Sequence, residues 1–108
     1  MNIWLDDARD PTKFRPDKKW TWVKSYKEFV LLVGYLTEIE EVSFDHDLAD
    51  IVPGVDQREK TGLDALNYLE ELIHLEKITV EWVSIHTANP SARKIMQMVA
   101  DKLNGRYS

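Results

Sequence analysis

The sequence contains no cysteine, no basic N-terminal region and no excess of positive charge. Without cysteine there can be no disulfide framework, which argues against a small secreted protein. The N-terminus also lacks a long apolar stretch, which argues against a signal peptide or a membrane span. With 14 Lys and Arg against 19 Asp and Glu, the net charge is -5, which argues against binding duplex nucleic acid through its phosphates. We therefore expect a cytoplasmic protein that binds neither membranes nor duplex nucleic acid.

The composition is that of a small globular domain. The chain has 108 residues, of which 44% are hydrophobic and 31% are charged. A chain of this kind can bury a core, although its length lies towards the lower end for a stable domain. We expect a single domain that spans residues 1–108. The pattern leaves the oligomeric state open.

Short apolar runs alternate with helical patterns along the chain, which predicts an α/β fold with a parallel sheet and right-handed crossovers. The β-branched and aromatic runs predict four strands, at Asn2–Leu5, Trp20–Lys24, Val42–Phe44 and Ile78–Ile85. The helical spacing and the capping residues predict three helices, at Tyr26–Thr37, Gly62–His74 and Ser91–Leu103.

Two segments are predicted to be irregular. The stretch Ala8–Lys19 contains Pro11 and Pro16 among scattered charges, so we expect a loop there. The stretch Ala49–Lys60 contains a proline, a glycine and several charges, so we expect an exposed connection that can move over a site.

The tryptophans in the predicted strands are interpreted as packing residues. We expect Trp4 and Trp82 in the core, and Trp20 and Trp22 on one face of the second strand. The alternative is an aromatic platform for a nucleobase.

Polar residues follow three predicted strands at the points where the strands end. These residues are Asp6-Asp7, Asp45-His46-Asp47 and His86-Thr87-Ala88-Asn89. In an open parallel sheet the carboxyl ends of the strands share one edge, and ligands bind outside that edge. Carboxylates gathered there repel one another unless they share a cation or a proton, so the pattern predicts Mg²⁺ or a similar hard ion. A phosphate would complete the coordination.

Each of these groups also has a purely structural interpretation. Asp6 and Asp7 precede a loop and are equally compatible with turn capping. For His46 and His86, a hydrogen-bonded structural role competes with metal ligation and with acid-base work. Asn89 is most simply a helix N-cap, although a helix N-terminus also favours phosphate.

Several phrases of the sequence together resemble a known family. They are Trp4-Leu5-Asp6-Asp7, Ser43-Phe44-Asp45-His46-Asp47-Leu48, Thr61-Gly62 and His86-Thr87-Ala88-Asn89-Pro90. They resemble the cyclic-phosphate processing receiver domains of bacteria and phages, which are similar to the receiver domains of response regulators. The resemblance spans nearly the whole chain. It implies a small, flavodoxin-like three-layer fold with about four parallel strands, whose first helix and fifth strand are degenerate or missing.

The resemblance to receivers also implies roles for individual residues. Asp6 and Asp7 would help to hold a divalent metal, Asp45 corresponds to the phosphoacceptor, and Thr87 would contact the phosphoryl group. Receivers supply a lysine to the phosphoryl oxygens from their fifth strand. No strand is predicted after Pro90, which argues against stable phosphorylation of the aspartate.

The leading hypothesis is a metal-dependent phosphoesterase-like domain that acts on a cyclic nucleotide or cyclic phosphate, so that the expected partner is a phosphorylated small molecule or a cyclic nucleotide. The expected roles are metal binding (Mg²⁺ or Mn²⁺) by Asp6, Asp7, Asp45 and Asp47, proton transfer by the catalytic residues His46 or His86, and phosphate binding by Thr87 and Asn89. One alternative is a non-catalytic receiver-like signalling or nucleotide-binding module with the same pocket. A second alternative is a polar sheet edge without a function.

Overall fold

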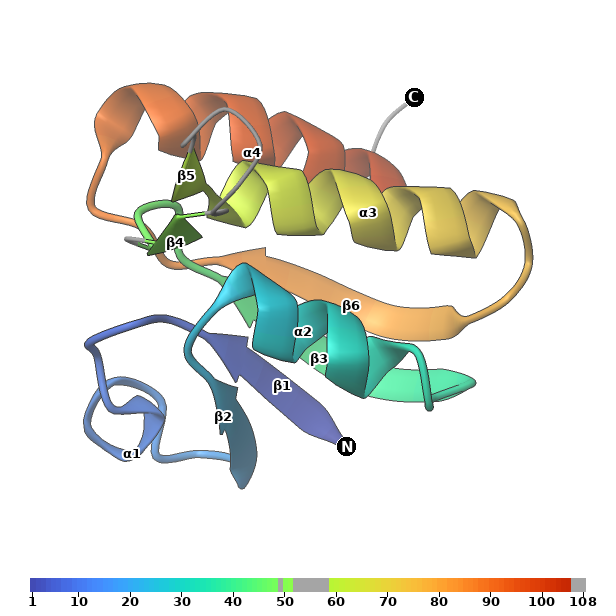
Figure 1. The fold of residues 1–108 in the computed structure, drawn as a ribbon, viewed down its shortest axis with the longest axis horizontal. Coiled ribbons are helices and arrows are strands. Elements are labelled where there is room, and N and C mark those ends of the chain that lie inside the picture. Colours follow the sequence, from blue (N-terminus) through green and yellow to red (C-terminus); the bar gives the residue numbers. More distant parts are fainter. Residues whose placement is uncertain (49, 52–58, 106–108) are drawn as a thin grey trace.

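The chain folds around one parallel sheet (Figure 1). The computed structural model describes residues 1–48, 50–51 and 59–105. The sheet contains β1 (Asn2–Leu5), β2 (Trp20–Val23), β3 (Glu38–Phe44) and β6 (Thr79–Ile85). Its strand order is β2-β1-β3-β6, and every neighbouring pair is parallel. This order is that of a flavodoxin-like sheet with four strands, so the predicted α/β fold class is confirmed.

Three helices cover one face of the sheet. They are α2 (Tyr26–Val33), α3 (Gly62–His74) and α4 (Pro90–Leu103), and Figure 1 shows α3 and α4 side by side. The core lies between these helices and the sheet. Its fully buried members include Ile3, Leu5, Phe29, Val42, Phe44, Leu66, Leu69 and Met96.

The opposite face of the sheet is covered by the segment of residues 8–19 instead of a long helix. The indole N–H of Trp4 donates to the carbonyl of Arg9 at 2.9 Å, and the indole N–H of Trp20 donates to the carbonyl of Arg15 at 2.8 Å. These two bonds hold the segment against the sheet. The expected third layer is therefore this segment, in agreement with the prediction that the first helix is degenerate.

The same segment contains one helical turn, α1 (Pro11–Phe14), where a loop was predicted. The turn forms because the Asp10 carboxylate accepts the backbone N–H of Thr12 and because proline is favoured at the first helical position. The two prolines of the segment therefore limit the helix to one turn and do not abolish it.

The other helix and strand boundaries differ from the prediction by more than one residue at two places. Helix α2 ends at Val33, earlier than the predicted Thr37, and Gly34 is its C-cap. Strand β3 begins at Glu38 and not at Val42, because its first residues pair with β6. The glutamates in this part of β3 hide its strand character in the sequence, since charged residues are depleted in strands.

Among its described residues, the connection from β3 to α3 contains a small antiparallel pair of strands. β4 (Asp50–Ile51) pairs in antiparallel orientation with β5 (Glu59–Lys60). Residues 49 and 52–58 lie outside the described residues, and so does the prediction that this connection is exposed and moves over a site. None of the described helices has the length and the apolar composition needed to cross a membrane.

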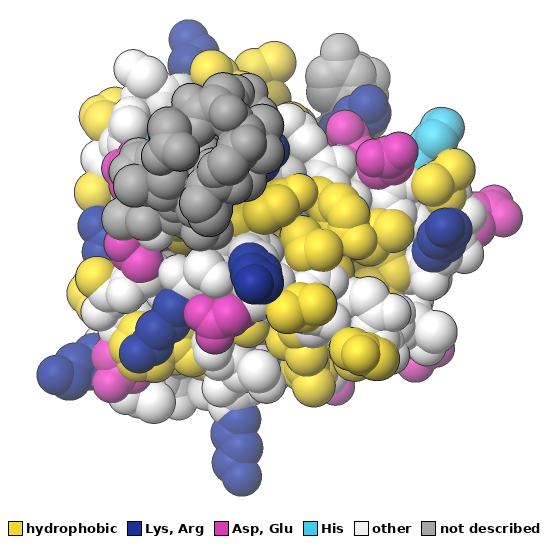
Figure 2. Space-filling model, viewed as in Figure 1, with side chains coloured by type: hydrophobic (Ala, Val, Ile, Leu, Met, Phe, Trp, Pro, Cys, Tyr) yellow, Lys and Arg dark blue, Asp and Glu magenta, His cyan; other side chains and the backbone are white. Residues whose placement is uncertain are grey.

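The tryptophans separate into buried and half-buried positions. Trp4 is buried as predicted, but it lies on the face opposite the helices, where its ring meets Trp20 edge-on. Trp82 is only half-buried and lies outside the core, so the prediction for Trp82 is wrong. On the helical face, Figure 2 shows hydrophobic side chains gathered near the centre of the view, over α2 and α3.

Candidate functional site

An acidic cluster lies at the carboxyl edge of the sheet. Asp6 and Asp7 follow β1, and Asp45 follows β3. One carboxylate oxygen of each residue lies within 4.8 Å of the other two. Asp6 and Asp45 are buried, whereas Asp7 is exposed. The cluster borders a pocket of about 270 Å³ lined by Asp6, Asp7, Ala8, Arg9, Asp45, Asp47 and Ala88.

Asp6 is held by hydrogen bonds to both of its carboxylate oxygens. Oδ1 accepts the backbone N–H groups of Ala8 and Arg9 at 2.9 Å, and Oδ2 lies 3.0 Å from Nε2 of His86. Burial by itself raises the pKa of Asp6, but the bond to His86 and the two backbone bonds outweigh it. The pKa of Asp6 is therefore lowered, and the carboxylate is ionised at neutral pH.

Asp45 has the opposite electrostatic setting. Burial raises the pKa of Asp45, and the negative charge of Asp6 raises it further.

The start of α3 approaches Asp45 closely. A Cβ atom at Gly62 would lie 1.5 Å from the Asp45 carbonyl oxygen, so only glycine fits there. This contact explains the Thr61-Gly62 phrase, in which Thr61 caps α3 and Gly62 allows the approach.

Arg9 lies beside both buried carboxylates and was not singled out from the sequence. Its Nη1 lies 3.5 Å from Oδ1 of Asp45 and 3.8 Å from Oδ2 of Asp6. The same nitrogen donates to the carbonyl of His86 at 3.3 Å. The position of Arg9, three residues after Asp6 in a turn that the Asp6 carboxylate caps, is the sequence signal that points to it.

His86 is enclosed between an aromatic ring and two polar side chains. Its imidazole stacks on the indole of Trp4, with ring centroids 3.8 Å apart and an angle of 7° between the planes. Nδ1 lies 2.7 Å from Oγ of Ser43, and Nε2 faces Asp6. Ser43, His86 and Asp6 thus form a hydrogen-bonded chain, but Ser43 is only 1% exposed, so its hydroxyl is not a nucleophile for a substrate.

His46 and Asp47 form a separate pair, of which Asp47 lines the pocket. Nδ1 of His46 lies 2.8 Å from Oδ1 of Asp47. The Asp47 side chain is 72% exposed and lines the pocket, but it is not in the group of three that closes within 4.8 Å. The structure therefore places Asp47 beside the acidic cluster, where it contacts His46 and not the three other carboxylates.

Thr87 and Asn89 follow β6 in the loop that leads into α4. Thr87 is buried, and its Oγ1 accepts the backbone N–H of Asn89 at 3.2 Å. Asn89 caps α4, because its Oδ1 accepts the backbone N–H of Ala92 at 3.1 Å. The capping interpretation of Asn89 is confirmed, while the phosphate-binding roles of Thr87 and Asn89 stay predictions.

Comparison with known protein families identifies the family of the chain. The family model described as "Cyclic-phosphate processing Receiver domain" matches residues 1–102. The chain belongs to this family. The match contains every residue predicted for the site, from Asp6 to Asn89. No curated protein and no solved structure gives a significant match to the chain.

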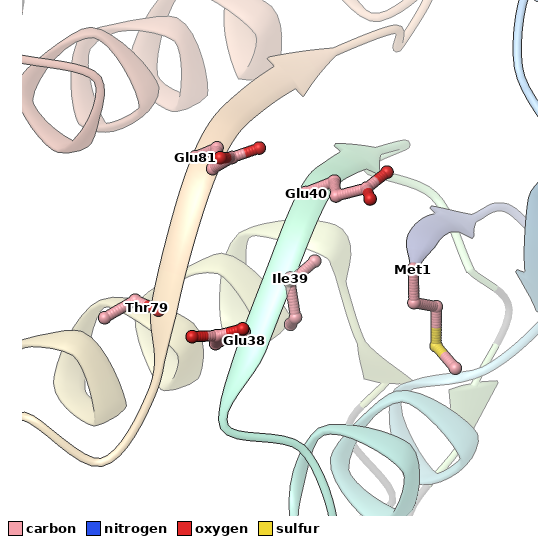
Figure 3. A pocket seen from close by; sticks show the side chains of 6 residues that line it. All are labelled: Met1, Glu38, Ile39, Glu40, Thr79 and Glu81. Carbon is pink, nitrogen blue, oxygen red and sulfur yellow. The ribbon is translucent and has the colours of Figure 1, made fainter.

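This receiver domain has a second acidic pocket at the opposite, amino-terminal edge of the sheet (Figure 3). It measures about 330 Å³ and is lined by Met1, Glu38, Ile39, Glu40, Thr79 and Glu81. Figure 3 shows its glutamates spread along β3 and β6. Among the described residues, only Asp6, Asp7 and Asp45 come close enough together to share a metal ion. The carboxyl edge is therefore the candidate site, as expected for a parallel sheet.

Proposed function

We propose that this receiver domain is a metal-dependent phosphoesterase that hydrolyses a cyclic nucleotide or a cyclic phosphate end. The observation that carries the proposal is the convergence of Asp6, Asp7 and Asp45 within 4.8 Å at the wall of a pocket. Membership of the cyclic-phosphate processing family supports the choice of substrate class. Because the three carboxylates come from two strand ends, the fold itself produces this arrangement.

The donor set fits Mg²⁺ or Mn²⁺. Both ions prefer oxygen ligands, and Mg²⁺ is commonly held by one or two carboxylates together with substrate phosphates. Asp6 and Asp7 would hold the ion with Asp45, and Asp47 lies near enough to the pocket to support them. When bound, the ion would supply Lewis-acid stabilisation of the charge on the phosphoryl oxygens.

The two histidines have different roles in this proposal. Hydrolysis of a cyclic phosphodiester forms a P–O bond to water, breaks one P–O ester bond and moves a proton to the leaving oxygen. His46 is the candidate for that proton transfer, because its ring contacts Asp47, which lines the pocket. His86 is a positioning residue, because both of its ring nitrogens face buried side chains, those of Ser43 and Asp6.

Thr87 and Asn89 are assigned to the phosphate side of the pocket. Their loop contributes Ala88 to the pocket wall and leads directly into α4. Backbone N–H groups at a helix N-terminus favour bound anions. The Thr87 hydroxyl is buried beside this wall and accepts the backbone N–H of Asn89, so contact with a phosphate oxygen would require the loop to open around it.

The test combines metal binding with turnover. Mn²⁺ at millimolar concentration should raise the melting temperature of the wild-type protein, because the ion binds the folded state. Asp45→Asn should remove that increase, while Glu40→Gln, which removes a carboxylate from the opposite edge, should retain it. A panel of cyclic mononucleotides, cyclic oligonucleotides and RNA with 2′,3′-cyclic phosphate ends should then contain a substrate that is cleaved with Mn²⁺.

The results distinguish the proposal from its main alternative. Binding of a panel member without cleavage indicates a non-catalytic nucleotide-binding or signalling module. A wild-type protein whose melting temperature does not respond to Mn²⁺, or responds equally in Asp45→Asn, contradicts the shared metal site.

A further inference from the structure

The side chain of Arg9 is close to two carboxylates without being tightly bonded to either of them. The distances from Nη1 to Asp45 and Asp6 are 3.5 and 3.8 Å. Charge-assisted hydrogen bonds between such groups are typically about 2.7–2.9 Å long. Arg9 therefore offsets the charge of the pair without a short hydrogen bond to either carboxylate.

The backbone of Arg9, in contrast, is fixed on both sides. Its N–H donates to Oδ1 of Asp6 at 2.9 Å, and its carbonyl accepts the indole N–H of Trp4 at 2.9 Å. The side chain is 32% exposed. Within the part of the chain that the structure describes, only Nη1 makes polar contacts, so Nε and Nη2 keep their N–H groups for another acceptor.

The aspartates make this pocket negatively charged, so a phosphate that enters it needs a nearby positive charge. Asp6, Asp7, Asp45 and Asp47 all line the pocket, and Arg9 is the one cationic residue among its described lining residues. A guanidinium presents its N–H donors in a planar fork that matches two oxygens of a phosphate. The geometry thus gives Arg9 both the position and the free donors for that contact.

We propose that Arg9 binds the phosphate of the substrate, in addition to the loop of Thr87 and Asn89. In the metal-free protein it balances the charge of Asp45 and Asp6, and when a metal ion occupies the carboxylates it turns its free donors to the phosphate oxygens. This inference rests on the proposed function, because it uses the same pocket. In this proposal, the segment of residues 8–19 supplies the positively charged side chain of the site.

The proposal predicts that removing the charge of Arg9 weakens phosphate binding without weakening Mn²⁺ binding. Loss of a cation beside the carboxylates should leave Mn²⁺ affinity unchanged or increase it. Loss of the donors should weaken inorganic phosphate binding by about tenfold to a hundredfold, the range for hydrogen bonds to a charged group. A residue with a merely structural role would lower both affinities together.

The experiment measures Mn²⁺ binding, and then phosphate binding with and without saturating Mn²⁺, by titration calorimetry. The variants are Arg9→Gln, Arg9→Lys and the control Lys13→Gln, which removes a positive charge from the exposed side of the same segment. Arg9→Lys should lie between wild type and Arg9→Gln, because lysine keeps the charge but loses the fork. Lys13→Gln should match wild type within about twofold, since surface charges contribute little.

Each outcome decides for or against Arg9. Equal phosphate affinity in Arg9→Gln and wild type overturns the proposal, and so does a parallel loss of Mn²⁺ and phosphate binding in both Arg9 variants. A wild-type protein that binds no phosphate in either condition also overturns it. If wild type binds phosphate through Arg9 but binds no Mn²⁺, the role of Arg9 stands and the metal-dependent function fails.

Discussion

The imidazole of His86 lies flat on the indole of Trp4, with ring centroids 3.8 Å apart. Stacking fixes the plane of the imidazole, and the contacts to Ser43 and Asp6 fix its rotation within that plane. A ring held in this way cannot swing towards a substrate without losing both hydrogen bonds. His86 therefore acts on the site through Asp6, whose Oδ2 it contacts at 3.0 Å.

The first prediction concerns this positioning role. His86→Ala should weaken Mn²⁺ binding by about tenfold to a hundredfold, the usual cost of removing a group that orients a metal ligand. Calorimetric titration of Mn²⁺ measures the effect. His74→Ala is the control, because His74 is an exposed histidine at the end of α3. Unchanged Mn²⁺ affinity in His86→Ala contradicts the positioning role.

The second prediction concerns His46. If His46 transfers the proton, His46→Ala should lower the turnover of a cleaved panel substrate by at least about a hundredfold. Its Mn²⁺ affinity should match that of wild type, because His46 contacts Asp47 and not the three clustered carboxylates. Turnover measured at saturating Mn²⁺ distinguishes the proton-transfer role of His46 from the metal-positioning role of His86. A His46→Ala protein that cleaves at the wild-type rate excludes His46 as the proton carrier.

The third prediction is that the two buried aspartates have opposite effects on the stability of the metal-free protein. Asp6→Asn should lower the free energy of unfolding by about 1–3 kcal/mol, because it weakens hydrogen bonds to a charged group. Asp45→Asn should raise it at pH 7, because burial and then the charge of Asp6 raise the pKa of Asp45. Chemical denaturation in a chelator measures both variants.

The sign for Asp45 also sets a pH dependence. A pKa that is raised in the folded state means that the ionised carboxyl costs stability at neutral pH, and that this cost disappears below the ordinary value of 3.8. The advantage of Asp45→Asn over wild type should therefore vanish as the pH falls towards that value. Two variants that shift stability in the same direction at pH 7 would contradict the electrostatic difference between Asp6 and Asp45.

The fourth prediction concerns Glu41, a buried carboxylate on the face of the sheet opposite the helices. Its oxygens lie 2.6 Å from Nζ of Lys18, 2.7 Å from Oγ of Ser84 and 3.3 Å from Nη1 of Arg15. Burial raises the pKa of Glu41, but the bonds to Lys18 and Ser84 and the nearby cations outweigh it, so the pKa is lowered from 4.5.

A lowered pKa means that Glu41 contributes stability above its unfolded pKa and loses that contribution as the pH falls through its folded pKa. Glu41→Gln should cost about 1–3 kcal/mol at pH 7, because the partners lose a charged acceptor. It should also make the unfolding free energy fall less steeply in acid. Glu40→Gln, at the exposed neighbouring position, should leave the acid profile of the wild type unchanged.

The order of the elements and the acidic edge follow from local patterns in the sequence. Helix α3 was predicted with its observed bounds, because a regular apolar spacing is a property of adjacent residues, and the capping box of Thr61 and Asp64 that the structure adds is equally local. Asp6 and Asp45 could be placed together without coordinates, because the carboxyl ends of parallel strands share one edge. The meeting of these two strand ends could therefore be predicted from the strand assignments and the parallel orientation alone.

The partners within the site depended on contacts between distant parts of the chain. Asp6 and His86 are 80 residues apart, and Arg9 reaches the carbonyl of His86 across 77 residues. No local periodicity encodes such contacts, because the first joins the ends of β1 and β6 and the second depends on the path of the segment of residues 8–19. The stacking of His86 on Trp4 likewise depends on tertiary packing. So does the separation of Asp47 from the three clustered carboxylates.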